Sequence, residues 1–350
     1  MPTPAITLPI WEPDVANSIV IPTKIRTRLM TLKFKARLPD RSWPAWSPSL
    51  AVPVASSEFL TDPSAVLKAR VQLIIGALLF STGGVAIKAA TLTGWQVSCF
   101  RSLLGGLVIL ALIPRARQGW TWRSLVVAVP FAATFTCFTL SNKLTTAANA
   151  MFLQETAPFY VLLLGPLLLG ERIVRRDLAF MAALVAGLVL ILGFDGEPLD
   201  TAPNPRLGNL LGACTGIAWA LTLTGLRWLA SRSASGRDQP ETAVVAGCFL
   251  AAAVAGLFSF PLDDTSGLDW LAIAYLGVFQ IGLAYYFVTQ SMRQLPVIET
   301  SLLLLVEPAF TPLWAWLLLA ENPGALAMLG GAVIILAIGF YSLLRAPTAS

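Results

Sequence analysis

The chain of 350 residues contains no histidine and few charged side chains. Histidine is the commonest general base and metal ligand in proteins, so its absence argues against most intramembrane hydrolase and metalloprotease mechanisms. Charged residues make up only 12% of the sequence, which is about half the fraction found in soluble domains. The sequence therefore predicts an integral membrane protein that is not an enzyme and that uses no metal or other cofactor.

Cysteine is also scarce, and its spacing indicates no site. All four cysteines lie inside apolar stretches without a CxxC spacing, which argues against disulfides and against a zinc site. The sequence has no P-loop of the form GxxxxGK[ST], so we do not expect this chain by itself to use ATP. The mild net charge of +5 indicates membrane topology rather than binding to nucleic acid.

The first 66 residues differ in composition from the rest of the chain. They carry ten of the 24 prolines, a basic cluster between Lys24 and Arg41, and no continuous apolar run. This composition is typical of a disordered segment. We therefore expect residues 1–66 to form a Pro-rich, basic cytoplasmic tail, with contact to anionic lipid as an alternative.

From residue 70 onward, apolar stretches long enough to span a bilayer recur with short connections between them. The sequence predicts ten helices, at about 71–90, 95–113, 124–142, 145–169, 178–195, 207–229, 243–261, 269–292, 295–319 and 324–344. Arginine and lysine gather in the connections after even-numbered helices, whereas the other connections are mostly acidic. Because positively charged connections stay in the cytoplasm, we expect both termini there, in a multi-pass protein of the inner cell membrane.

A stretch of 21 residues recurs at an offset of 150 residues. Residues 151–171 read MFLQETAPFYVLLLGPLLLGE, and residues 301–321 read SLLLLVEPAFTPLWAWLLLAE. The two copies share a central proline, Pro158 or Pro308, and a glutamate at the end. This recurrence predicts a protein built from two related halves.

The number of helices in each half sets their relative orientation. Five is an odd number, so the second half must enter the membrane from the opposite side. The sequence thus predicts an all-α fold of ten transmembrane helices in two inverted-topology repeats, residues 70–196 with helices 1–5 and residues 206–345 with helices 6–10. In such folds a substrate commonly binds between the halves, near the middle of the membrane.

Four features follow one another in order along the two halves. They are FSTGGVAIK at 80–88, Arg101 in the second helix, LLLGERI at 167–173 and LLLAE at 317–321. In this order the chain resembles the EamA-type ten-helix proteins of the drug/metabolite transporter superfamily, over about residues 70–345. The resemblance implies export, or less often uptake, of amino acids, metabolites or drug-like compounds. The second half departs from the pattern, because ENPG at 321–324 lacks the basic residue that follows the first-half glutamate.

Two carboxylates lie deep inside predicted helices. Glu155 is ten residues into the fourth helix and Glu307 is twelve into the ninth, which places both about 15–18 Å deep in a core of about 30 Å. A charge at that depth is costly unless it faces a cavity, a partner or a proton. The functional interpretation is proton coupling or recognition of a substrate amine. The alternative is a structural carboxylate that is satisfied by a hydroxyl group or an arginine.

Two basic residues offer the opposite charge. Arg101 lies six residues past Trp95, about 9 Å into the second helix, and Lys88 lies near the outer end of the first. Either side chain could neutralise Glu155 or bind a substrate carboxylate, and Lys88 could instead extend its amine to the membrane surface. Both signs of charge near one cavity would suit a zwitterion such as an amino acid.

Proline, aromatic and amide residues complete the candidate site. Pro158 and Pro308 each remove a backbone hydrogen bond and favour a kink, and such breaks in membrane helices often line cavities. The alternative is a proline that the helix merely tolerates. Further candidates for contact with a substrate are Trp219, Tyr285, Gln154 and Gln280. As a group they suit an amphipathic organic substrate better than a bare ion.

Together these features predict a secondary transporter that moves a small amphipathic metabolite, such as an amino acid or a drug-like compound, by alternating access. Export is the expected direction, and proton coupling is one option. The alternatives are an uncoupled facilitator and a non-transporting membrane receptor or scaffold. The expected partners are the substrate, the lipid bilayer and, in the coupled case, protons. The protein is expected to be a monomer or homodimer and to bind no nucleic acid.

Overall fold

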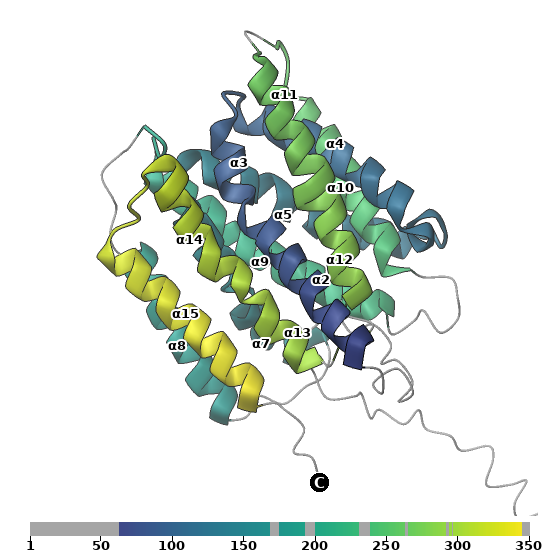
Figure 1. Cartoon of the computed structure of the whole chain (residues 1–350). Helices are drawn as coiled ribbons and strands as arrows, with labels where there is room; N and C mark the ends of the chain where they lie inside the picture. Colours follow the sequence, from purple (N-terminus) through teal and green to yellow (C-terminus); the bar gives the residue numbers. More distant parts are fainter. Residues whose placement is uncertain are drawn as a thin grey trace, which may run out of the picture. The chain divides into compact units, whose positions relative to one another are not determined.

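A helix covers most of each predicted apolar segment in the computed structural model (Figure 1). The structure describes residues 63–168, 175–192, 200–230, 239–262, 265–291, 294–295 and 297–344. Residues 1–62 of the predicted tail and Glu171 lie outside the described residues. The described part consists of helices and the turns that connect them.

The helices of the first half begin at residues that suit a helix start. They are α2 (Pro63–Ser81), α3 (Gly83–Ala89), α4 (Gly94–Leu112), α5 (Trp122–Leu144), α6 (Ala147–Gln154), α7 (Ala157–Leu168) and α8 (Arg175–Leu192). The predicted tail was too long by four residues, because α2 already begins at Pro63. Proline fits the first turn of a helix, where its missing N–H has no intrahelical partner. The hydroxyl groups of Thr93 and Thr146 cap α4 and α6 by accepting from the backbone N–H three residues further on.

The second half contains one helical segment of a less common kind. Its helices are α9 (Pro205–Ala230), α10 (Pro240–Gly256), α11 (Gly267–Ala274), α12 (Ala284–Ser291), α13 (Val297–Leu304), α14 (Val306–Leu319) and α15 (Ala325–Leu344). Between α11 and α12, the segment η6 (Tyr275–Leu283) forms a π-helix. The eighth predicted helix is therefore continuous, but its middle third is wound more widely than an α-helix.

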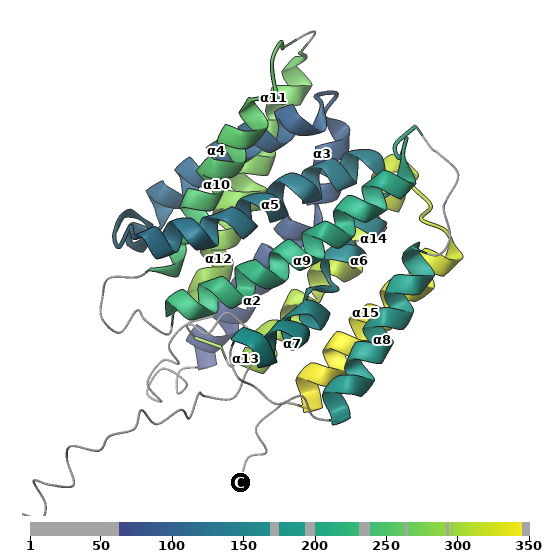
Figure 2. The ribbon, with the colours of Figure 1, turned by 180° about the vertical axis from the view of Figure 1, so that it is seen from behind.

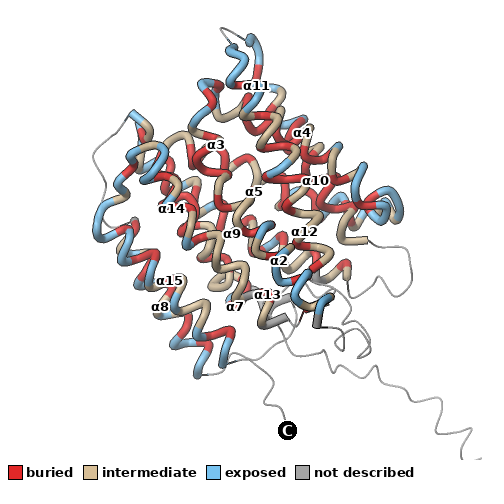
Figure 3. The backbone as a smooth tube through the Cα atoms, viewed as in Figure 1, coloured by how far each residue is buried: buried red, intermediate tan, exposed pale blue. Residues whose placement is uncertain are grey.

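Seven helical stretches among the described residues are long and apolar enough to cross a membrane. They are Ser64–Ala89, Gly94–Leu112, Trp122–Leu144, Pro205–Ala230, Gly267–Ser291, Leu302–Leu319 and Ala325–Leu344. Large apolar side chains cover the outside of the molecule: Leu336 and Phe340 of α15 are 71% and 66% exposed. Figure 3 shows such exposed positions along α8 and α15, and mostly buried positions along α4 and α10. A continuous apolar exterior suits lipid rather than water, and the protein is an integral membrane protein that crosses the bilayer several times.

The fourth and ninth predicted helices are each broken into two. α6 ends at Gln154, four residues before Pro158, and α13 ends at Leu304, four residues before Pro308. Proline has no N–H to donate to the carbonyl four residues earlier, and its ring crowds that carbonyl. The two prolines therefore coincide with short breaks at equivalent places in the recurring sequence, where Glu155 and Leu305 keep right-handed helical dihedral angles. That these breaks kink the two spans stays a prediction.

The helices pack in pairs that join distant parts of the sequence. In the view from behind, α5 lies beside α9 and α10, and α8 lies beside α15 (Figure 2). α4 packs against α10 and η6, and α2 packs against α12 and α14. Small residues allow one of the closest approaches. A Cβ added to Gly187 of α8 would lie 2.8 Å from the carbonyl oxygen of Gly330 of α15, so both backbones meet directly.

Ala320 ends α14 in the left-handed conformation, at φ 52° and ψ 25°. This conformation costs a residue with a Cβ about 1–2 kcal/mol, whereas glycine adopts it readily. We expect Ala320→Gly to raise the free energy of unfolding by about 1 kcal/mol, measured as a higher melting temperature in detergent. Gly324→Ala is the matched control and should lower stability, because Gly324 has φ +83° and open space around its Cα. An unchanged melting temperature in both variants would contradict this account.

Candidate functional site

A cavity of about 130 Å³ lies among the helices, beside both proline breaks. Its walls are Phe80, Arg101, Thr134, Phe135, Phe138, Gln154, Trp219, Gln280, Tyr285, Val288, Leu304 and Glu307. Gln154 and Leu304 are the last residues of α6 and α13, so each break contributes one side of the wall. An engineered cavity of about 150 Å³ in another protein binds benzene. The cavity therefore has room for one ring or a group of similar size.

Six of the candidate residues from the sequence meet at this cavity. They are Arg101, Gln154, Trp219, Gln280, Tyr285 and Glu307. They come from both halves of the chain, on α4, α6, α9, η6, α12 and α14. The other two candidates, Glu155 and Lys88, are not among the lining residues. That any of these residues binds a substrate stays a prediction.

Arg101 is a buried cation that forms no ion pair with the residues that the structure describes. Only 2% of its surface is exposed. One terminal N–H group donates to the carbonyl oxygen of Phe135 at 3.2 Å, and the guanidinium carbon lies 5.1 Å from the centre of the Phe135 ring. Its Nε has no hydrogen-bond partner, and no carboxylate of the described residues lies within 4 Å of it. A buried cation with a donor to spare favours an anionic ligand.

Glu307 brings a carboxylate to the same cavity. It is the second residue of α14, directly after the break. Among the described residues, no basic side chain forms an ion pair with it. Glu155 lies in the other break, between α6 and α7. A proton or a cationic ligand would relieve the cost of an ionised Glu307 in the apolar interior.

Aromatic rings form much of the remaining wall. Phe80 and Tyr285 meet edge to face, with ring centres 5.3 Å apart. Phe135 stacks on Phe131 at 4.6 Å, which holds it in place beneath the Arg101 guanidinium. Rings in such pairs are favourably placed and lose little freedom when a further ring packs against them. The cavity thus combines charge, amide groups and aromatic surface.

Three cavity residues lie on α5 and were not among the candidates from the sequence: Thr134, Phe135 and Phe138. One signal was available, because Thr134 and Phe138 are four residues apart and therefore share a face of the helix. Nothing in the sequence says that this face points inward. The contact between Phe135 and Arg101, which lies 34 residues earlier in the chain, is visible only in the structure.

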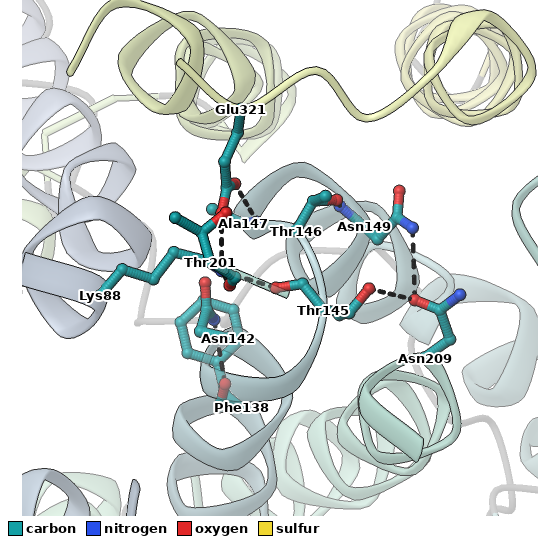
Figure 4. A network of polar contacts seen from close by, with 10 residues as sticks. All are labelled: Lys88, Phe138, Asn142, Thr145, Thr146, Ala147, Asn149, Thr201, Asn209 and Glu321. Carbon is teal, nitrogen blue, oxygen red and sulfur yellow. Dashed lines mark hydrogen bonds and ion pairs between the residues drawn. The ribbon is translucent and has the colours of Figure 1, made fainter. Parts of the chain in front are cut away.

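A second polar cluster lies around Lys88 and Glu321, outside the cavity (Figure 4). Lys88 Nζ lies 2.7 Å from Glu321 Oε1, and only 3% and 0% of the two side chains are exposed. Lys88 also donates to the carbonyl oxygens of Thr145, at 2.8 Å, and of Thr201. Glu321 Oε2 accepts from the N–H of Ala147, the first residue of α6, at 2.9 Å. This set of contacts is the Lys88–Glu321 network.

The network corrects the sequence-based interpretation of Lys88. Its amine does not reach the membrane surface, because it is enclosed by a carboxylate and two carbonyl groups. It does not neutralise Glu155, since its carboxylate partner is Glu321. A further branch reaches α9, where Asn209 Oδ1 accepts from the Thr145 hydroxyl at 2.7 Å. Lys88 therefore joins segments from both halves of the chain.

The described residues contain no group of three or more histidine, cysteine, aspartate or glutamate side chains arranged to hold a metal ion. The four cysteines are free thiols. The groups around the cavity instead offer a ligand one cation, one carboxylate, two amides and several rings. These groups can bind and orient a small polar molecule with an aromatic or apolar part.

Comparison with known proteins identifies relatives of this chain. The EamA-like transporter family matches residues 67–193 and 206–343. The pseudopaline exporter CntI of Pseudomonas aeruginosa is 27% identical over 286 residues, which cover 78% of this chain and 95% of that protein. The aromatic amino acid exporter YddG of Ancylobacter novellus is 29% identical over 148 residues, 41% of this chain and 49% of that protein. One solved crystal structure has the same fold, with a TM-score of 0.54 at 23% identity over 81% of this chain and 99% of that one.

Proposed function

The chain belongs to the EamA-like transporter family, and on this premise we propose that it is a secondary transporter that exports a small zwitterionic metabolite by alternating access. Membership of the family makes it a membrane transporter and not an enzyme. Two of its relatives are named as exporters. Their names refer to pseudopaline and to aromatic amino acids, so export of an organic molecule is the common element.

The observation that carries the proposal is the pair of unmatched charges at one cavity. Arg101 has no ion pair among the described residues and has a free donor at Nε, and Glu307 lines the same space. A buried charge without a partner is costly, so a ligand that neutralises it gains affinity. A carboxylate at Arg101 and an amine at Glu307 would satisfy both groups. The ring-lined walls around Tyr285 and Trp219 suit an apolar or aromatic side chain.

We further propose ten membrane crossings in two inverted repeats, with both termini in the cytoplasm of the inner cell membrane. The packing of the helices supports the repeat, because the contacts between helices recur when each helix is replaced by its equivalent in the other half. The contact of α6 with α9 has its counterpart in that of α13 with α2, and the contact of α7 with α9 in that of α14 with α2. The contact of α4 with η6 has its counterpart in that of α10 with α5. The contact of α8 with α15 is its own counterpart. Rocking between such halves would expose the cavity to each side in turn.

Proton coupling through Glu307 completes the proposal. A carboxylate that lines the cavity can bind a proton or a substrate amine in alternation. Protonation from outside would release the amine, and binding of the amine inside would release the proton. An uncoupled facilitator is the alternative, in which Glu307 only recognises the substrate.

The experiment is solute flux in proteoliposomes with a panel of amino acids, with and without a pH gradient. We expect flux that the gradient accelerates, and an Arg101→Gln variant with kcat/KM lowered about 100-fold, since a buried charge pair contributes about 2–5 kcal/mol. Lys68→Gln is the control, because it removes a positive charge from an exposed position. Wild-type protein that moves no member of the panel would contradict the proposed substrate class. Flux that ignores the gradient would favour the facilitator.

A further inference from the structure

Gln280 brings a hydrogen-bond acceptor without a partner among the described residues to the wall of the cavity. The residue is only 6% exposed, and it lines the cavity from the π-helical segment η6. Its Oε1 atom is buried and has no hydrogen-bond partner in the described part of the chain. Such atoms are rare in folded proteins, because a buried oxygen that loses its water and gains no donor is destabilising. The Gln280 oxygen is therefore available to a donor on a bound molecule.

The π-helix determines which residues of this span face the cavity. A π-helical turn holds more residues than an α-helical turn, and single π-turns are frequent at functional sites. One extra residue in a turn rotates the side chains that follow by about 100° around the helix axis. Gln280 within η6 and Tyr285 in α12 both line the cavity in this winding. If the whole span were α-helical, the side chains of Gln280 and Tyr285 would point further apart around the helix axis and would not both line the cavity.

Close packing against α4 fixes η6 in this position. A Cβ added to Gly282 of η6 would lie 2.2 Å from Cγ1 of Val108, and a Cβ added to Gly105 of α4 would lie 2.6 Å from Cγ2 of Ile281. Each helix thus has a glycine where the other presents a branched side chain. The two elements that carry the cavity arginine and the cavity glutamine interlock, so the distance between those groups is held by contact of each glycine with a side chain of the other helix.

The Nε2 end of the Gln280 amide lies next to the backbone of α3. A Cβ added to Gly83 of α3 would lie only 2.8 Å from Gln280 Nε2, so the NH₂ group lies close against the α3 backbone. Any larger residue at position 83 would displace the amide. The oxygen end is then the part of the side chain that a ligand can use.

We propose that Gln280 is a specificity-determining residue, whose Oε1 accepts a hydrogen bond from an N–H or O–H donor of the transported molecule. The inference rests on the proposed function, because it assumes that this cavity binds the substrate. Arg101 has its own unpartnered donor at Nε, so the matching ligand carries an acceptor and a donor. A site built to accept a hydrogen bond discriminates against analogues that lack the donor, because its acceptor would then stay unpaired.

The test uses two pairs of probes that differ only in an amino group: L-phenylalanine with 3-phenylpropionate, and L-leucine with 4-methylpentanoate. Flux of each is measured in proteoliposomes for the wild type and for Gln280→Met, which is similar in length and cannot accept strongly. We expect Gln280→Met to raise the KM for the amino acids about tenfold, the equivalent of one hydrogen bond of about 1.4 kcal/mol, and to leave the KM for the amine-free probes unchanged.

Two further variants separate hydrogen bonding from folding and packing. In Gln280→Glu both oxygens of the side chain can accept a hydrogen bond, whichever way the carboxylate is turned. This variant should therefore retain the lower KM for the amino acids relative to the amine-free probes. Gly83→Ala leaves the glutamine in place but displaces its amide, and it should weaken the same preference. The melting temperature of each variant identifies any that fails to fold, and the comparison within a probe pair is unaffected by the amount of active protein.

Specific outcomes overturn the proposal. Equal changes of KM for both members of a pair in Gln280→Met would assign Gln280 to packing. Loss of the preference in Gln280→Glu would assign the contact to Nε2 as a donor. If the wild type moves the probes but Gln280→Met behaves identically, only the role of Gln280 fails. If the wild type moves none of the four probes, the proposed function fails with it.

Discussion

Replacing Glu321 by alanine is expected to lower the free energy of unfolding by about 3–5 kcal/mol, the range for breaking a buried ion pair from one side. The variant would leave the Lys88 amine with two carbonyl groups and no counter-charge in a site where 3% of its side chain is exposed. It would also remove the acceptor for the first N–H of α6. Thermal unfolding in detergent, followed by the helical signal, measures the change.

Two control variants separate the charge effect from other causes. The double replacement Lys88→Met with Glu321→Leu should recover most of the lost stability, because an apolar pair leaves no charge uncompensated. Arg70→Gln breaks the ion pair between Arg70 and Glu299, which are 48% and 29% exposed, and should have a far smaller effect. A Glu321→Ala variant that melts like the Arg70→Gln variant would show that the Lys88–Glu321 network does not stabilise the fold.

The second large effect is expected on coupling. Replacing Glu307 by glutamine should reduce gradient-driven flux to the level of empty liposomes, while exchange of labelled for unlabelled substrate continues. Glutamine has nearly the shape of glutamate and can still accept a hydrogen bond from the amine, but it cannot take up and release a proton. It therefore removes the coupling step, and exchange remains measurable at higher substrate concentration. Measuring net flux and exchange in the same liposomes separates these two consequences.

Glu155→Gln is the matched control for this experiment. Glu155 lies in the other helix break and is not among the residues that line the cavity, so its variant should retain gradient-driven flux. If Glu155→Gln abolishes that flux and Glu307→Gln does not, the coupling site lies at the first break. If both variants keep it, the coupling site is elsewhere or the protein is a facilitator.

Much of the helical framework could be predicted from the sequence, because apolar length is set by bilayer thickness and both proline breaks have a local cause. The candidate residues Arg101 and Glu307 could also be chosen, since charges inside apolar stretches are rare. The partner of Lys88 could not be found this way. Glu321 lies 233 residues further along the chain, and two of the other acceptors are backbone carbonyl groups, which every residue carries.

The π-helix could not be predicted either. Its residues, YLGVFQIGL, have the apolar character of any membrane span, and its close contacts are with α4, a distant segment of the chain. Gln280 was a candidate because it is polar, but its special position depends on that winding and on Gly83 of another helix. Properties that depend on close contact between distant segments are absent from local sequence patterns.

The positions of the two helix breaks bear on how the two halves of the chain arose. They fall at matching places, Pro158 and Pro308, in sequences that recur at an offset of 150 residues. In the two-repeat architecture that we propose, one proline in an ancestral half would account for both breaks. Gln154 and Leu304 would then derive from a single ancestral residue, of which one copy is now polar and the other apolar. The two halves would thus contribute different chemistry to the one cavity that both residues line.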